Sequence, residues 1–350
     1  MHKPSIILLL SVIVLFAACK KTEVTPDEDF SLVLTNLSEN VILNTYLDLK
    51  DKASALQTAT QNLEADPNTA NLEIARTAWA AARSPWEQSE GFLFGPVDQE
   101  GLDPSLDSWP VNVTDLNNVL NGGNALTPEF LQAQEGTLKG FHTIEYLLWG
   151  TDGHKAVAGF TAREFEYLAA CSAVLASDAA QLYERWAPAG GDYIANVLNA
   201  GKTGSIYPSQ KAALEEMANA LSIIADEVGN GKINDPFSQQ DLSLEESRFS
   251  NNSKADFANN IRSIKNIYTG KYLTFGTLTG LSAVIADRDA ALDVRLKTEI
   301  DAAIAAIEAI PGTFGDAVFN NASAVSDAQT KVRTIQQTLE SDILPLISKL

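Results

Sequence analysis

The sequence predicts an all-α fold built of two helical bundles. Apolar residues recur at helical spacing along most of the chain, beginning with residues 30–64. No stretch alternates apolar and polar residues over the length that a half-buried strand needs. Residues 188–208 are rich in glycine and proline, so this segment is predicted to join a first domain, residues 30–190, to a second, residues 207–350.

Local signals mark the ends of the predicted helices. Thr-Pro-Glu at 127–129 supplies an N-cap, a first-turn proline and an early acid, while Thr161 with Glu164 has capping-box spacing. The stretch 95–124 is rich in Gly, Pro, Asp and Asn and is predicted to be a long loop. The predicted helices cover residues 30–64, 69–92, 127–149, 161–186, 209–227, 243–268, 273–310 (interrupted near Asp287) and 322–350.

The two halves of the sequence are weakly similar to one another. Residues 87–92 (EQSEGF) resemble residues 245–249 (EESRF), and residues 140–142 (GFH) occupy a place comparable to that of residues 280–282 (GLS). These matches fit a duplicated four-helix unit, and chance similarity between helices explains them as well.

The first eighteen residues are typical of a signal peptide. His2 and Lys3 precede an apolar run of thirteen residues, which is too short for a membrane span of about 20. The run ends in Phe-Ala-Ala-Cys, which resembles a lipobox and predicts a lipid on Cys19. An ordinary cleaved signal with a chance cysteine is the alternative. Residues 19–29 would then form a polar tether, and the protein is expected in the bacterial cell envelope, anchored to the outer membrane and facing the periplasm or the surface.

Composition excludes several kinds of site. With 45 acidic against 25 basic residues and a net charge of −20, the chain lacks the clustered Lys and Arg that nucleic-acid binding requires. Besides Cys19 the only cysteine is Cys171, which lies in an apolar run and is predicted to be buried and unreactive. His142 and His154 are the only histidines after the signal peptide, so a three-histidine zinc site is excluded.

Residues 140–149 (GFHTIEYLLW) carry the strongest functional signal. This segment is apolar nearly all round, which predicts a buried helix with His142 and Glu145 on one face. Burying an ionisable pair costs several kcal/mol unless its groups bind each other, other polar partners or a metal. The pair therefore predicts either a structural hydrogen bond or a ligand site. Gly140 predicts a close approach by another segment.

Four sequence blocks, in order, resemble the imelysin family. Residues 140–145 fit its GxHxxE motif, and the likeness extends over residues 30–350. The other matching blocks are 86–96 (WEQSEGFLFGP), 108–112 (SWPVN), and 246–250 (ESRFS) followed by 268–270 (YTG). The family often carries Asp after its Trp-Pro-x, and Asn112 stands at that position here.

The resemblance implies a two-domain helical lipoprotein linked to iron or other metal uptake, with the motif in a cleft between the domains. His142 and Glu145 match the functional pair, and Glu90 is expected as a third metal ligand. The expected ion is iron or zinc, bound alone or as a small chelate, with an uptake partner in the envelope. Trp86, Asn112, Glu246, Ser247 and Arg248 are expected to line the cleft, Arg248 pairing with Glu246 or holding an anionic co-ligand.

Two other functions stay open. The imelysin family was first described as peptidases, and a metallopeptidase would use His142 and Glu145, with Glu145 as the candidate catalytic residue and no evident separate base. However, a zinc peptidase of the HExxH type needs a second histidine, and His154 falls in a predicted loop. A serine hydrolase would need a histidine and an aspartate beside its nucleophile, and Ser247 has no evident partner of this kind apart from His142. A non-catalytic interaction module with a structural His–Glu pair is the other alternative.

Overall fold

The computed structural model describes residues 28–350 of the chain. Helices make up most of this range and no strand occurs in it, so the all-α prediction is confirmed. Within the same range, no helix combines the length and the apolar character that a bilayer crossing requires. Cys19, the predicted signal peptide and most of the predicted tether lie outside the described residues.

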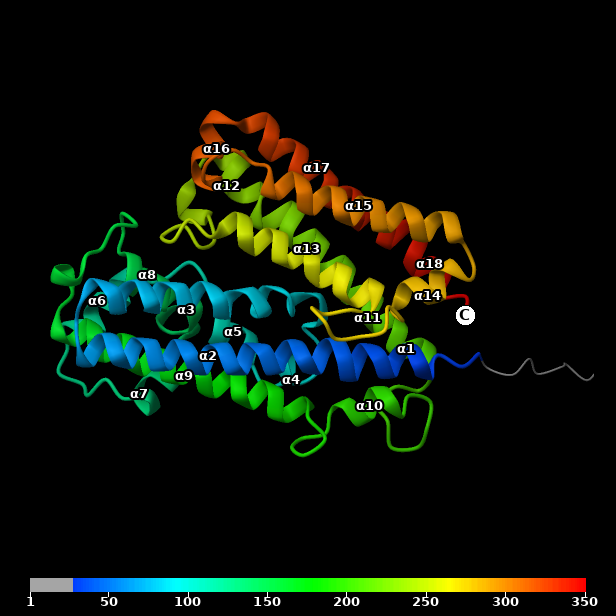
Figure 1. Ribbon diagram of the computed structural model, residues 1–350, viewed down its shortest axis with the longest axis horizontal. Helices are drawn as coiled ribbons and strands as arrows, with labels where there is room; N and C mark the ends of the chain where they lie inside the picture. The colour runs from blue at the N-terminus through cyan, green and yellow to red at the C-terminus, as the bar shows by residue number, and fades with distance from the viewer. Residues whose placement is uncertain (1–27) are drawn as a thin grey trace, which may run out of the picture.

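The first half of the chain forms one layer of helices (Figure 1). Its longest element is a continuous helix, Ser31 to Ala65, which passes through a π-helical stretch and packs against α3 and α9. The elements of this layer are α1 (Ser31–Thr35), η1 (Asn36–Ile42), α2 (Leu43–Ala65), α3 (Thr69–Glu87), η2 (Glu90–Phe92), α4 (Pro96–Gln99), α5 (Leu102–Asp107), α6 (Val113–Leu120), α7 (Pro128–Gln132), η3 (Gly136–Leu138), α8 (Gly140–Trp149), η4 (Val157–Gly159), α9 (Ala162–Trp186) and α10 (Ile194–Leu198).

The second half forms the other layer, in which four long helices, α11, α13, α15 and α17, pack against one another (Figure 1). Its elements are α11 (Gln210–Asp226), η5 (Glu227–Lys232), α12 (Asn234–Gln239), η6 (Leu242–Leu244), α13 (Ser253–Thr269), α14 (Leu281–Ala286), α15 (Ala290–Glu308), α16 (Phe314–Asn320), α17 (Ala322–Thr338), η7 (Leu339–Ile343) and α18 (Leu344–Ile347).

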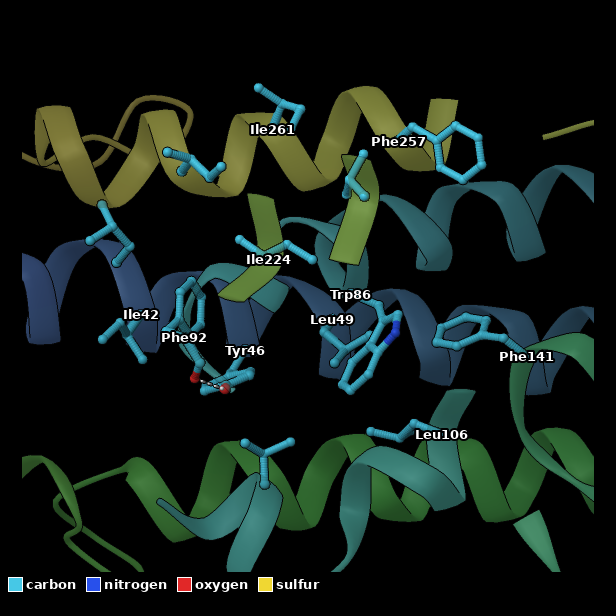
Figure 2. Close-up of a cluster of buried hydrophobic side chains, with 14 of the residues drawn as sticks. Ile42, Tyr46, Leu49, Trp86, Phe92, Leu106, Phe141, Ile224, Phe257 and Ile261 are labelled. Carbon is cyan, nitrogen blue, oxygen red and sulfur yellow. Dashed lines mark hydrogen bonds between the residues drawn. The ribbon is translucent and has the colours of Figure 1, made fainter. Parts of the chain in front are cut away.

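One continuous core joins the two layers. Helix α13 packs against α3, and α11 packs against the short 3₁₀ helix η2. Figure 2 shows buried side chains of both layers together, with Tyr46 and Phe92 from the first and Ile224 and Ile261 from the second. The predicted domain boundary at residues 188–208 stays a prediction. The shared packing runs through both layers and does not divide the core in two.

Helix α8 begins later than predicted. The predicted helix 127–149 is broken, since α7 ends at Gln132 and α8 starts at Gly140. Gly140 has a φ of 75°, and a Cβ at this position would collide with the carbonyl oxygen of Leu106. The close approach predicted for Gly140 is therefore confirmed, and it seats the start of α8 against the end of α5.

The predicted helix 243–268 is wrong in its first part. Residues 245–252 form turns, and α13 begins only at Ser253. Ser247 and Asn251 have positive φ values of 50° and 59°, which an α-helix does not accommodate. The turns place polar groups of this segment against the first layer. The predicted helix 273–310 likewise starts late, at α14, after a loop.

The predicted helix caps agree with the structure. Thr127 accepts a hydrogen bond from the backbone N–H of Phe130, and Thr161 and Glu164 form both bonds of a capping box. These contacts lie within four residues of sequence, so they depend little on the rest of the fold.

Candidate metal centre

Nine buried ionisable side chains meet where the two layers join, and we call this group the buried charge cluster. Each is less than 10% exposed. Six are carboxylates, two are fixed cations and one is a histidine, so carboxylates exceed fixed cations by four. Buried charges are costly unless they are paired, which means that the group favours added positive charge, as protons or as a metal ion. The members are Arg83, Glu87, Glu90, Asp107, His142 and Glu145 from the first layer and Lys232, Glu246 and Asp256 from the second.

Several elements supply the cluster. Arg83 and Glu87 lie one turn apart on α3 and share a face. Asp107 is the last residue of α5, so the contact of Gly140 with Leu106 brings α8 and its His142 next to Asp107. Glu246 comes from the turns that precede α13.

The two ring nitrogens of His142 face different partners. Its Nδ1 lies 3.2 Å from Oε2 of Glu145. Its Nε2 lies 3.2 Å from Oδ1 of Asp107 and 3.7 Å from Oε1 of Glu246, but neither contact has hydrogen-bond geometry. Nε2 of His142 and Oε2 of Glu246 therefore both lack a hydrogen-bond partner in the interior, where such groups are normally satisfied.

Glu145 is held from the second layer. The backbone N–H and the hydroxyl of Ser250 both donate to Oε1 of Glu145, each at 2.7 Å. The other oxygen of Glu145 faces the His142 ring. Such a carboxylate fixes the orientation of the imidazole and makes it a better ligand through the opposite nitrogen.

The Nε2 side of His142 fits a metal ion. Asp107, His142 and Glu246 each present one ligand atom, and these atoms lie within 4.8 Å of one another. An ion bound at about 2.1 Å separates neighbouring ligand atoms by about 3.0–3.4 Å, close to the 3.2 and 3.7 Å measured from Nε2. One nitrogen and two carboxylates suit iron, zinc or manganese.

At the end of the cluster away from the His142 ring, Arg83 pairs with the buried carboxylates. Arg83 forms ion pairs with Glu87 and Asp107, and its Nη2 lies 2.7 Å from Oε1 of Glu246. Nε of Arg83 also lies 3.5 Å from Oδ1 of Asp256. The pairs with Asp107 and Glu246 mean that an ion at His142 would share these two carboxylates with Arg83.

The ionisation of the cluster follows from these neighbours. Burial raises the pKa of Glu87 and of Glu90, and for Glu90 the charge of Glu87 raises it further. Burial opposes the charge of Asp107 too, but Arg83 and His142 outweigh it and lower its pKa. Burial and Arg83 oppose a charge on His142, yet Asp107 and Glu145 raise its pKa well above the usual value.

An acidic cavity adjoins the cluster. It measures about 250 Å³, and the charged residues that line it are Glu90, Asp103, Asp107 and Glu227. Burial and the charge of Asp107 raise the pKa of Asp103 to about 6. Larger hollows of about 460, 610 and 600 Å³ lie elsewhere and touch no member of the cluster.

The structure brings most of the predicted cleft residues together. Trp86 is buried and donates from Nε1 to Oδ2 of Asp107 at 2.6 Å. Ser247 is buried and lines a cavity of about 10 Å³ with His142, Glu145 and Arg248.

Three predicted roles need correction. Asn112 is exposed and caps α6 through the N–H of Asp115, so it does not line the cleft. Arg248 lies over the ring of Phe249 at 4.5 Å, and Glu246 pairs with Arg83 and Lys232 instead. Asp107 and Glu246, rather than Glu145 and Glu90, face Nε2 of His142; Glu145 faces Nδ1, and Glu90 binds Lys232.

Five members of the cluster were absent from the sequence prediction. Arg83 and Glu87 could have been found as a charged i, i+4 pair in the largely apolar stretch 78–87 (AWAAARSPWE). Asp107 directly precedes the matching block at 108–112, which is a weak signal. Lys232 and Asp256 have no local pattern that marks them.

Comparison with known proteins identifies the family. The family model described as Imelysin, which carries a peptidase label, matches residues 42–342. The chain belongs to the imelysin family. Iron-regulated protein A of Synechococcus elongatus is 31% identical to this imelysin-family chain over 340 residues, covering 96% of the chain and 91% of that protein.

Solved structures share the fold. A crystal structure from Parabacteroides distasonis, described as an iron-regulated protein A precursor, superposes with a TM-score of 0.83 at 29% identity, covering 94% of this chain and 97% of that one. An imelysin-like protein from Psychrobacter arcticum gives a TM-score of 0.74 at 15% identity over 91% and 95% of the two chains. The second likeness concerns the fold alone.

Proposed function

We propose that this imelysin-family protein binds one metal ion, iron or zinc, at His142, Asp107 and Glu246, as part of metal uptake at the cell envelope. The observation that carries the proposal is the buried, unpartnered Nε2 of His142, which faces two carboxylates in a cluster with excess negative charge. Relatives named as iron-regulated proteins support an iron-related role. A lipid on Cys19, holding the protein in the outer membrane, is part of the same proposal.

The site favours a bare ion over a chelate. His142 is only 2% exposed, and the two carboxylates that face its Nε2, Asp107 and Glu246, are buried as well, so a bulky chelate has no direct access to the three ligand atoms. A metal ion binds the neutral imidazole, and Asp107 and Glu145 raise the pKa of His142 well above its usual value, so protons compete with the ion for Nε2. Affinity should therefore fall as the pH is lowered.

Peptidase activity receives less support from this geometry. Glu145 would have to act as a base, but Ser250 occupies one of its oxygens and the His142 ring faces the other. We therefore expect that the chain is not an efficient protease.

The test compares His142→Ala with wild type and with His154→Ala, the second histidine, which is exposed and outside the cluster. All three proteins are purified without a histidine tag, titrated with Fe²⁺ and Zn²⁺ by calorimetry, and melted without metal. We expect His142→Ala to bind each metal at least 100-fold more weakly than wild type. Loss of a residue that only orients a metal ligand typically lowers metal affinity about 10–100-fold, and loss of the ligand itself should lower it more. His154→Ala should match wild type.

A different result would assign the histidine to structure. If His142→Ala melts at a lower temperature but binds both ions as tightly as wild type, the pair is structural and the proposed function is wrong.

A further inference from the structure

A second group of carboxylates adjoins the proposed site. Glu87, Glu90 and Asp107 each present an oxygen, and the three oxygens lie within 4.8 Å of one another. Asp107 also belongs to the group formed with His142 and Glu246. A carboxylate shared by two such groups is the arrangement of two-metal centres, in which the ions lie about 3.5–4 Å apart.

A side-chain ammonium already lies against two members of this second group, Glu87 and Glu90. Nζ of Lys232 lies 2.8 Å from Oε2 of Glu90, 3.2 Å from Oε1 of Glu246 and 3.7 Å from Oε2 of Glu87. Lys232 is 2% exposed and ends the π-helical element η5, so it reaches the cluster from the second layer. Its partners are carboxylate oxygens, the atoms that would hold a hard cation.

Asn260 also binds the two carboxylates that pair with Lys232. Nδ2 of Asn260 donates to Oε2 of Glu87 at 2.5 Å and to Oε2 of Glu90 at 2.9 Å. Oδ1 of this fully buried Asn260 has no hydrogen-bond partner. Arg83 pairs with the other oxygen of Glu87, Oε1, so Oε2 is left to Lys232 and Asn260.

We propose that Lys232 restricts the centre to one metal ion, because its ammonium lies against Glu87 and Glu90, two of the three carboxylates that would hold a second ion. This inference rests on the proposed function, since it concerns the number of ions bound next to His142. A one-ion centre lacks the paired ions with which two-metal hydrolases hold both the attacking and the leaving oxygen. Lys232 would thus decide between a binding site and a two-metal centre.

The experiment counts bound Mn²⁺ in four proteins. Wild type, Lys232→Met, Lys232→Arg and Lys139→Met are incubated with excess Mn²⁺, freed of unbound ion by gel filtration, and analysed for manganese per chain. We expect Lys232→Met to bind one ion more than wild type. Lys232→Arg keeps a cation in place and should match wild type, as should Lys139→Met, which removes a buried lysine outside the cluster.

A double variant and a measurement of folding test whether misfolding explains the result. Lys232→Met leaves carboxylates unpaired, so Lys232→Met/Glu90→Gln is measured too, and circular dichroism with and without Mn²⁺ reports the fold of each protein. The double variant should return to the wild-type count, because it removes an oxygen ligand of the second ion. Paramagnetic resonance should show a coupled Mn²⁺ pair in Lys232→Met and an isolated ion in wild type.

The outcomes separate the two hypotheses. If folded Lys232→Met binds the same number of ions as a wild type that binds one, the role of Lys232 is wrong and the proposed function stands. If wild type binds no Mn²⁺ and also binds neither Fe²⁺ nor Zn²⁺ in the calorimetric titrations, the proposed function is wrong, whatever Lys232→Met does.

Discussion

The two ends of the buried charge cluster share carboxylates, but they differ in whether each ligand atom has a partner. Around Arg83 and Lys232, the carboxylates meet fixed side-chain cations at ion-pair distance. Around His142, the ring nitrogen Nε2 faces Asp107 and Glu246 without a hydrogen bond. The difference shows that a group of buried carboxylates does not by itself mark a metal site. What matters is whether a ligand atom such as Nε2 of His142 is left without a partner after the fixed cations have paired with the carboxylates.

The largest effect on stability is expected at Arg83. Arg83→Met should lower the free energy of unfolding by at least about 3–5 kcal/mol, because four carboxylates would lose a buried partner. Urea unfolding followed by circular dichroism measures the loss. The control is Arg262→Met, which removes a more exposed ion pair with Glu308 and should cost about 0–1 kcal/mol. Equal losses in the two variants would mean that the cluster does not depend on its fixed cations.

A smaller effect on stability is expected at Asp103, a buried acid next to the carboxylates of the cluster. The pKa of Asp103 is about 6 in the folded protein against 3.8 for an unperturbed aspartate, so its ionisation weakens the fold as the pH rises between these values. Asp103→Asn should be more stable than wild type above pH 6, by at most about 3 kcal/mol, and should lose this advantage below pH 4. Urea unfolding of both proteins in metal-free buffer from pH 4 to 7.5 provides the measurement. An advantage that stays constant with pH would contradict the explanation.

The smallest effect is expected at the histidine end. Ser250→Ala should weaken metal binding about 10-fold, since Glu145 would lose one of the hydrogen bonds that hold it against the His142 ring. Stability should change by about 1 kcal/mol or less. Ser172→Ala, a buried hydroxyl that bonds to Leu168 of its own helix, is the matched control and should leave affinity unchanged. Calorimetric titration with Zn²⁺ measures both variants, and unchanged affinity in Ser250→Ala would show that Glu145 does not act through the histidine.

Local sequence predicted the helices and part of the site. Helical periodicity, the cap at Thr127 and the capping box at Thr161 were all realised, because they depend on contacts within a few residues. The prediction failed at residues 245–252, where a charged, helix-like sequence forms turns. There the ion pairs of Glu246 and the bonds from Ser250 outweigh local helix preference.

The sequence alone determined that the protein is helical and that His142 and Glu145 share a face of a buried helix, since both follow from spacing along the chain. Only the tertiary structure decided which groups meet the two nitrogens of His142. Ser250 reaches Glu145 across 105 residues, and Glu246 reaches Arg83 across 163. No pattern over a few residues encodes such meetings, because they arise when the two layers pack and their buried charges must find partners.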